Sequence, residues 1–284
     1  MDLITKAQEE YALLDSGYGR KLEQFGDIIL DRPDPVVEHK KMNEEIWEQA
    51  HARFDNEWIE QIPMPKEWHA KLYLKANLYL APSKHVGMFP EQVLNWRWIE
   101  KCVKSEDRKL NVLNLFGYTG LATVAAAKGG ADVTHVDAAK SALTKTKMNL
   151  ELNGLIDAKV RFIPDDATKF VAREIKRGVR YDGIILDPPA FGKGADGETW
   201  ELEKKLIPLL ELCRQVLSDK PVFILLNGYA NSYTHHTYLA ALEDMMQGIP
   251  GEFSSGDLKI REMNTDRTIN AGMYTRWSNK TIAI

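Results

Sequence analysis

VLNLFGYTG, at residues 112–120, joins an apolar run to a glycine turn, and an amphipathic segment at 119–128 follows it. A strand that ends in such a turn and opens into a helix directs backbone amides and the helix N-terminus at whatever lies beyond the strand's carboxyl end. Gly117 and Gly120 let a ligand approach the backbone closely. The same pattern also occurs in ordinary connections between a strand and a helix. The turn alone is therefore compatible with a ligand site and with a simple connection.

The chain after this turn repeats the alternation of strand and helix. Short β-rich runs predict strands at residues 111–116, 132–137, 160–164, 181–187 and 221–227. Apolar residues at helical spacing predict helices at residues 119–128, 141–153, 168–177, 202–217 and 236–247. Two last strand-like runs, at residues 258–263 and 273–277, have only a polar turn between them and indicate a hairpin. We therefore expect an α/β fold with a Rossmann-like sheet of seven strands.

Acidic residues follow the next two predicted strands. Asp137 ends the second strand about 20 residues after the glycine turn, where a carboxylate accepts hydrogen bonds from both hydroxyls of a ribose. Helix capping is the alternative, although Ser141 or the neighbours of Ala139 are better placed to cap the next helix. The third strand ends in Asp165 and Asp166, and an acidic residue there could accept the exocyclic amine of adenine or cap the following helix. An adenosine-type ligand is expected.

The glycine turn argues against a dinucleotide. Its sequence is Gly-Tyr-Thr-Gly at residues 117–120. Pyrophosphate binding needs G-x-G-x-x-G, with glycines where the phosphates press on the backbone. A cofactor that lacks a pyrophosphate fits this turn better.

The fourth predicted strand delivers the sequence DPPAF to the same edge of the sheet. Pro188 and Pro189 fix the backbone and remove amide donors, so we expect the carbonyls of this loop to be free for a substrate. Asp187 adds a carboxylate and Phe191 an aromatic face, and such a set can hold a flipped-out base. A proline-stiffened turn is the alternative. The small, polar segment 192–198 could act as a lid.

Composition limits the classes of function. Of 284 residues, 44% are hydrophobic and 27% charged, as in an ordinary globular protein. The 37 Lys and Arg against 41 Asp and Glu give a net charge of -4, so contact with nucleic acid must use a local basic surface. Cys102 and Cys213 fall in predicted helical stretches, which argues against a disulfide. Without a signal pattern or a bilayer-length apolar run, a cytoplasmic location off the membrane is expected.

The first part of the chain has a different pattern. Short runs broken by Gly, Asp and Pro precede a Trp-rich helical piece and the strand-like KLYLKANLYL at residues 71–80. We expect a small α+β module at residues 1–95 and a catalytic domain at residues 96–284. No long linker separates the two, so we expect them to share a cleft.

The motifs NLFGYTG, HVDAAK, DDA and DPPAFG, in this order and spacing, resemble those of class I S-adenosylmethionine-dependent rRNA methyltransferases. The family around the large-subunit rRNA cytosine methyltransferase I is the best match, since LLDSGYGRKLEQFG and KHVGMFPEQVLNW also resemble its N-terminal module. The resemblance implies S-adenosyl-L-methionine as cofactor, RNA as partner and no metal. It leaves a monomer or a homodimer open.

The resemblance also implies roles for particular residues. Asp137 would bind the ribose and Asp166 the adenine. Phe89 and Gln92 would close over the cofactor from the N-terminal module, with packing at a domain junction as the alternative. The methionine part would be lined by Asn114, Phe116, Gly117, Tyr118, Thr119 and Gly120.

Two departures from the family pattern matter. Methylation of carbon five of cytosine needs a cysteine that adds to the ring, and this chain has Asn227, Gly228 and Tyr229 where that cysteine follows the fifth strand. A nitrogen or oxygen acceptor needs only alignment and loss of a proton, which Asp187 and Asn227 could supply. We therefore expect methylation of a nitrogen in RNA, with a small-molecule or protein substrate, or a non-catalytic RNA-binding role, as alternatives.

The second departure concerns RNA recognition. Relatives often carry an extra N-terminal RNA-binding domain, whereas this sequence starts at the small module. RNA recognition would then depend on that module and on a basic cluster, for which a solvated helix face is the alternative. The cluster consists of Lys169, Arg173, Lys176, Arg177 and Arg180.

Overall fold

The computed structural model describes residues 1–193, 199–229 and 233–283. Their contacts divide the chain into two compact units. The first, here called the core unit, contains Met1–Asp2, Asn95–Asp257 and Gly272–Ile284; the second, the N-terminal unit, contains Leu3–Leu94 and Leu258–Ala271. The N-terminal unit thus includes a piece of the chain that comes after the whole run of alternating strands and helices.

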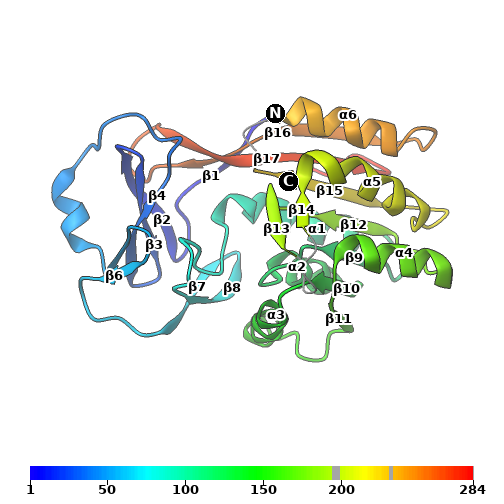
Figure 1. Ribbon diagram of the computed structural model, residues 1–284, viewed down its shortest axis with the longest axis horizontal. Coiled ribbons are helices and arrows are strands. Elements are labelled where there is room, and N and C mark those ends of the chain that lie inside the picture. The colour runs from blue at the N-terminus through cyan, green and yellow to red at the C-terminus, as the bar shows by residue number, and fades with distance from the viewer. Residues whose placement is uncertain (194–198, 230–232, 284) are drawn as a thin grey trace. The chain divides into compact units, whose positions relative to one another are not determined.

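The main sheet has eight strands in the order β1-β16-β17-β15-β12-β9-β10-β11 (Figure 1). The five parallel strands are β9 (Asn111–Leu115), β10 (Asp132–Asp137), β11 (Val160–Pro164), β12 (Gly183–Leu186) and β15 (Phe223–Gly228). The remaining strands are β16 (Glu252–Arg261), β17 (Thr268–Ser278), which is antiparallel to β15, and β1 (Leu3–Thr5), parallel to β16. The expected α/β, Rossmann-like sheet is confirmed, with β1 as an added edge strand.

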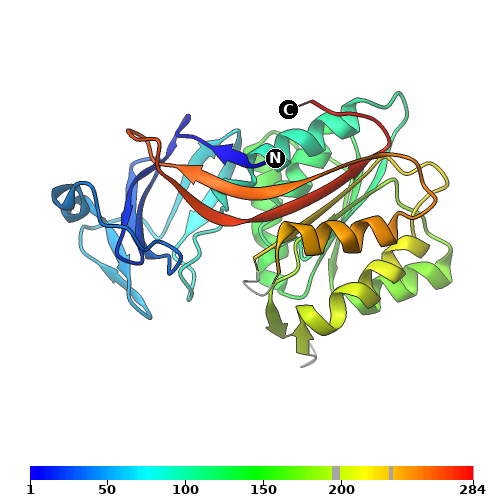
Figure 2. The same ribbon diagram turned by 90° about the horizontal axis from the view of Figure 1, so that it is seen from above.

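Helices cover both faces of the parallel strands. On one side α4 (Ala167–Arg177), α5 (Leu202–Gln215) and α6 (His235–Met245) lie next to one another, as Figure 2 shows. The helices α2 (Leu121–Gly129) and α3 (Lys140–Leu152) also contact each other, and α1 (Val93–Lys104) packs Trp98 against Phe223 of β15. The interiors of β9, β10, β12 and β15 are buried, and each fully buried aliphatic side chain contributes about 1.5–3 kcal/mol of stability.

The strand register explains why side chains from distant parts of the chain meet at one edge. Leu115 of β9 pairs with Val136 of β10 and Leu186 of β12, and Leu186 pairs with Leu226 of β15. Because all four strands are parallel, the residues that follow these partners leave the sheet at the same carboxyl edge. That edge therefore carries the glycine turn after β9 and the ends of β10, β12 and β15.

The N-terminal unit contains two small sheets. A five-stranded sheet consists of β2 (Tyr11–Gly17), β3 (Arg20–Phe25), β4 (Ile28–Pro33), β5 (Ala52–Phe54) and β6 (Trp58–Glu60), and the Trp-rich piece forms a short 3-10 helix, η1 (Glu44–Gln49). The prediction of a single strand at residues 71–80 is wrong. Tyr73 has a φ of 66°, a left-handed turn, so the chain reverses between β7 (Glu67–Leu72) and β8 (Leu74–Tyr79).

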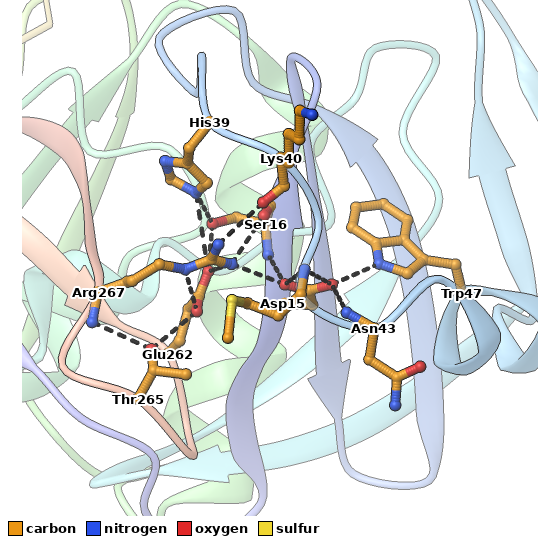
Figure 3. Close-up of polar contacts among 10 residues, drawn as sticks. Asp15, Ser16, His39, Lys40, Asn43, Trp47, Glu262, Thr265 and Arg267 are labelled. Carbon is orange, nitrogen blue, oxygen red and sulfur yellow. Dashed lines mark hydrogen bonds and ion pairs between the residues drawn. The ribbon is translucent and has the colours of Figure 1, made fainter.

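Within this unit, a buried ionic network joins β2 to the loop between β16 and β17 (Figure 3). Arg267 donates from Nη2 to Asp15 Oδ1 at 2.8 Å and from Nε to Glu262 Oε2 at 2.7 Å. Ser16 Oγ donates to Glu262 Oε1 at 2.5 Å, and Thr265 Oγ1 donates to Glu262 Oε2 at 2.9 Å. We call these five residues the hairpin-tip cluster.

Candidate active site

The glycine turn after β9 has an unusual backbone. Phe116 and Tyr118 have φ values of 57° and 48°, a region that costs ordinary residues about 1–2 kcal/mol each. Gly120 has a φ of 79°, and a Cβ at that position would collide with Thr146. A Cβ at Gly117 would collide with the ring of His135 on β10. The glycines are therefore needed for packing of the turn against its neighbours, whether or not a ligand presses on them.

A chain of hydrogen bonds beneath the turn fixes its shape. Asn114 Nδ2 donates to Thr123 Oγ1 at 2.9 Å, and that hydroxyl lies 2.9 Å from His135 Nδ1. His135 Nε2 faces Thr146 Oγ1 at 3.3 Å, and Thr146 bonds the carbonyl of Tyr118 at 3.1 Å. Burial lowers the pKa of His135 to about 4, so the imidazole is neutral at physiological pH. The Asn114 side chain supports the turn from below through this network.

Asp137 lies directly beside the turn. Its carboxylate accepts the backbone N–H of Tyr118 at 2.8 Å and that of Ala139 at 2.8 Å, one on each oxygen. Each oxygen keeps a second lone pair, which suits a pair of ribose hydroxyls. Burial raises the pKa of Asp137 above its ordinary value, against the effect of the two N–H donors. The expected cap at Ser141 is wrong, because α3 begins at Lys140 with Ala139 as an N-cap that makes no side-chain bond.

Asp166 has the capping role that was one of its two alternatives. Its Oδ1 accepts the backbone N–H of Lys169 at 2.9 Å and so caps α4. The neighbouring Asp165 accepts the N–H of Asp166 and forms an ion pair with Arg173. Capping uses one oxygen of Asp166, so an additional contact to an adenine amine stays a prediction.

Asp187 follows β12 with one oxygen out of reach of solvent. The structure gives Asp187 Oδ1 no hydrogen-bond partner among the described residues. Burial raises the pKa of this carboxyl to about 7, while a hydrogen bond from Asn227 opposes the rise. Asn227, at the end of β15, is 3% exposed, and it forms a polar pair with the half-buried Asp187 at the carboxyl edge.

Tyr238 is a member of this site that the sequence did not indicate. It comes from α6, and its ring packs so closely on Gly228 that a Cβ there would collide with it. Its buried hydroxyl also has no partner among the described residues, and burial, with smaller contributions from Tyr233 and Asp187, raises its pKa. No motif surrounds Tyr238, so only the fold could reveal it.

The loop after Asp187 differs in part from expectation. The carbonyls of Pro189 and Ala190 are not free: they accept Trp200 Nε1 at 2.7 Å and the N–H of Leu202 at 3.1 Å. Pro188 is buried, whereas Phe191 is 61% exposed on β13 (Phe191–Lys193), which pairs with β14 (Thr199–Glu201). Most of the expected lid, residues 194–198, lies outside the described residues.

Several predicted residues are placed elsewhere. Phe89 caps the short helix η2 (Pro90–Gln92) of the N-terminal unit, with its ring 5.2 Å from that of His85, and Gln92 is buried at the end of η2. Their contact with a cofactor stays a prediction. In the basic cluster, Arg173 and Arg177 already pair with Asp165 and with Glu174.

Neither cysteine resembles a nucleophile. Cys102 on α1 and Cys213 on α5 are free thiols with 0% exposure, and burial raises the pKa of both well above the usual value. Within the described residues, no three His, Cys, Asp or Glu side chains are arranged to hold a metal. In the same part of the chain, every helix is too short or too polar to cross a membrane.

A mostly parallel sheet of this order, with a glycine turn and acidic residues at adjacent strand ends, has the layout of a Rossmann-like ligand-binding fold. The S-adenosylmethionine-dependent methyltransferase family matches residues 46–217. A solved S-adenosylmethionine-dependent methyltransferase from Agrobacterium tumefaciens is 37% identical, with a TM-score of 0.94 over 99% of this chain and 94% of that one. The protein therefore belongs to the S-adenosylmethionine-dependent methyltransferases, and the expected enzyme class and cofactor are confirmed.

Two curated relatives are named for ribosomal RNA. The ribosomal RNA large subunit methyltransferase K/L of Shewanella frigidimarina is 30% identical over 213 residues, 72% of this chain and 28% of that protein. The ribosomal RNA large subunit methyltransferase I of Klebsiella pneumoniae is 43% identical over 81 residues, 28% of this chain and 20% of that protein. The chain thus spans less than a third of the length of either relative.

Proposed function

We propose that the protein transfers a methyl group from S-adenosylmethionine to a nitrogen of a nucleobase in RNA, and that the RNA is ribosomal. The observation that carries the proposal is the unpartnered Oδ1 of Asp187 next to Asn227, at the edge that also holds the glycine turn and Asp137. A buried carboxylate oxygen without a donor is costly unless a ligand supplies one. An N–H of a base is such a donor.

The residues around the glycine turn fit the adenosine half of the cofactor. In this proposal Asp137 accepts the ribose hydroxyls with its second lone pairs, and Asp166 accepts the adenine amine with Oδ2. Phe116, Gly117, Tyr118, Thr119 and Gly120 present backbone to the methionine half. The bound cofactor supplies an electrophilic methyl group, and the chain's own residues position the atom that receives it.

Asp187 and its neighbours are proposed to hold the base. Oδ1 accepts the N–H of the target nitrogen, which aligns the lone pair and lets a proton leave as the methyl group arrives. A carboxyl with a pKa of about 7 is suited to that proton transfer near neutral pH. The exposed ring of Phe191 and the hydroxyl of Tyr238 are available to stack on the base and to bond its edge.

A nitrogen acceptor is favoured over carbon five. The carbon route needs a thiolate that adds to the ring, and the two buried, high-pKa thiols are unsuited to it. Part of the loop after β15, residues 230–232, lies outside the described residues, but the sequence there is Ala-Asn-Ser and contains no cysteine.

The choice of ribosomal RNA is supported by the names of the relatives, and a cytoplasmic location goes with it. The small module at residues 1–95 is proposed to contribute to RNA binding, ahead of a catalytic domain at 96–284. To test the substrate, the protein is incubated with labelled S-adenosylmethionine and rRNA from a strain that lacks the gene. Label on one rRNA nucleoside, identified by mass as an N-methyl base, is expected. Label on no RNA fraction contradicts the proposal, and label on carbon five contradicts its nitrogen half.

A further inference from the structure

Asn227 makes a second contact that points away from Asp187 and leads to a buried arginine. Arg276 of β17 donates from Nε to Asn95 Oδ1 at 3.0 Å, and its Nη2 donates to the same oxygen. A guanidinium has donors and no acceptor. The oxygen of the Asn95 amide must therefore face Arg276, and the NH₂ group of that amide must point the other way.

The orientation that Arg276 gives the Asn95 amide determines the orientation of the next side chain, Asn227. Asn95 Nδ2 donates to Asn227 Oδ1 at 3.1 Å, so the oxygen of Asn227 is occupied. The NH₂ group of Asn227 is then the part left to face Asp187, which agrees with the hydrogen bond from Asn227 that lowers the pKa of that carboxyl. We call Arg276, Asn95 and Asn227, ending at Asp187, the arginine relay.

The relay is shielded from water along its length. Arg276, Asn95 and Asn227 are 3%, 0% and 3% exposed. The guanidinium lies 4.6 Å from the ring of Trp98 and 4.7 Å from that of Tyr274, an arrangement that stabilises a desolvated cation. Burial lowers the pKa of Arg276 to about 10, so it stays charged at neutral pH. Because these three side chains are almost fully buried, bulk water does not compete for their hydrogen bonds, and the direction of the amides is well defined.

We propose that Arg276 and Asn95 are positioning residues that fix the direction of the Asn227 amide, so that Asp187 receives a donor on one oxygen and keeps Oδ1 for the substrate. This inference rests on the proposed role of Asp187. Neither Arg276 nor Asn95 belongs to a recognisable sequence motif, and they come from opposite ends of the core unit. Their effect on the reaction is exerted through Asn227.

Among the residues that the structure describes, few other groups around Asp187 can titrate near neutral pH. On α6, Tyr238 faces it, and burial together with Tyr233 and Asp187 keeps that phenol protonated. On β15 the neighbour is the neutral Asn227, and on β9 it is the carbonyl of Leu115, which accepts the Asp187 N–H at 3.4 Å. A change in the titration of Asp187 in a relay variant is therefore assignable to the relay.

The test is the titration of Asp187 in the purified protein without RNA. The ¹³Cγ resonance of Asp187, assigned by its loss in Asp187→Asn, is followed with pH in wild type, Asn95→Leu, Asn95→Asp and Arg276→Lys. Asn95→Leu removes both links without adding charge. Asn95→Asp keeps the acceptor for Arg276 but has no donor for Asn227. The Asn227 amide then has to flip, so that its NH₂ group faces the new carboxylate. Arg276→Lys keeps a cation that donates hydrogen bonds and accepts none, so the Asn95 oxygen should still face it.

We expect the pKa of Asp187 to rise by at least about half a unit in Asn95→Leu, by more in Asn95→Asp, and to stay within about 0.3 units of wild type in Arg276→Lys. An unchanged pKa in Asn95→Leu overturns the inference, because the shift in Asn95→Asp is then plain repulsion. A shift in Arg276→Lys as large as that in Asn95→Leu overturns it too. Asn95→Ala gives the same neutral comparison if the leucine variant does not fold.

A kinetic measurement separates positioning from folding. With an RNA that accepts the methyl group, the pH at which kcat rises should increase together with the pKa of Asp187. The dissociation constant for S-adenosylmethionine should change less than about two-fold. Parallel loss of cofactor binding would mean that the relay only supports the fold. Because the titration needs no substrate, its outcome stands even if the labelling experiment fails to find RNA as the methyl acceptor.

Discussion

At the scale of single residues, Asp187 is held in its site at a cost to folding. Burial raises its pKa to about 7 from an ordinary value near 4, so the folded state binds a proton that the unfolded state has already released over that range. The folded state therefore loses stability relative to the unfolded state as pH rises from about 4 to 7. Residues kept at such a cost are frequent in active sites.

Asp187→Asn should remove this penalty. At pH 8 we expect the variant to be more stable than wild type, by at most about 4 kcal/mol, since one pKa unit corresponds to about 1.4 kcal/mol. At pH 4 the two should unfold alike, because the wild-type carboxyl is then neutral as well. Thermal unfolding at both pH values measures the difference. Equal melting temperatures at pH 8 would contradict the buried environment of this carboxyl.

Asp187→Ala should abolish turnover and leave cofactor binding within a few-fold. The reason is that Asp187 is proposed to align the acceptor nitrogen, whereas the proposed cofactor contacts come from the turn after β9 and from Asp137. Methyl transfer is measured with labelled cofactor, and binding of S-adenosylmethionine by calorimetry. Parallel loss of both activities would give the loop a structural role instead.

Sequence reasoning indicated those residues of the candidate site that lie in local motifs, and it missed those that do not. Asp137 and Asp187 each end a predicted strand, so their positions followed from the strand pattern. Tyr238, Asn95 and Arg276 lie on elements whose packing decides which side chains reach the edge. No local pattern carries that information, because it depends on how α6, α1 and β17 lie against β15.

At the scale of elements, the parallel strands and their helices were predictable because their periodicity is strong. The predicted strand at 132–137 coincides with β10, and the predicted helix at 168–177 begins one residue after the start of α4. The two strands of the hairpin were predicted too short, at residues 258–263 and 273–277, whereas β16 and β17 have 10 and 11 residues. The first residues of β16 are polar apart from the exposed Phe253, and buried and half-buried residues alternate only from Gly256 onward, so that half of the strand shows no buried face.

The glycine turn offers a matched pair of substitutions. Gly120 and Gly154 have similar φ values of +79° and +69°, but a Cβ at Gly120 meets Thr146 while one at Gly154 meets nothing within 4 Å. Gly154→Ala should cost about 1 kcal/mol from backbone strain alone. Gly120→Ala should cost at least about 2 kcal/mol and weaken cofactor binding. Urea unfolding and calorimetry measure the two effects, and equal costs would contradict the crowding at the turn.

At the scale of the whole molecule, the hairpin-tip cluster makes the N-terminal unit depend on the end of the chain. Arg267→Ala would leave Asp15 and Glu262, both 1% exposed in their side chains, without their shared cation. We expect a loss of about 3–5 kcal/mol in the free energy of unfolding. Asp266→Ala is the control, since Asp266 is 99% exposed and its 3.5 Å pair with Arg261 should contribute less than about 1 kcal/mol.

Urea unfolding of both variants provides the measurement. A loss below about 1 kcal/mol in Arg267→Ala would show that the backbone N–H groups and Trp47, which also bond Asp15, are sufficient to hold it. The sequence could not have predicted this cluster, because its members are charged residues in turns and strands that no short-range pattern connects.

The cluster also has a consequence for biosynthesis. Arg267 is 252 positions from Asp15 along the chain, and translation adds about 5–20 residues each second. Strands β2 to β4 thus leave the ribosome roughly 10 to 50 seconds before the arginine that neutralises their buried carboxylate exists. During that interval the nascent N-terminal segment is incomplete, and its need for chaperones should be highest just before the last strands are translated.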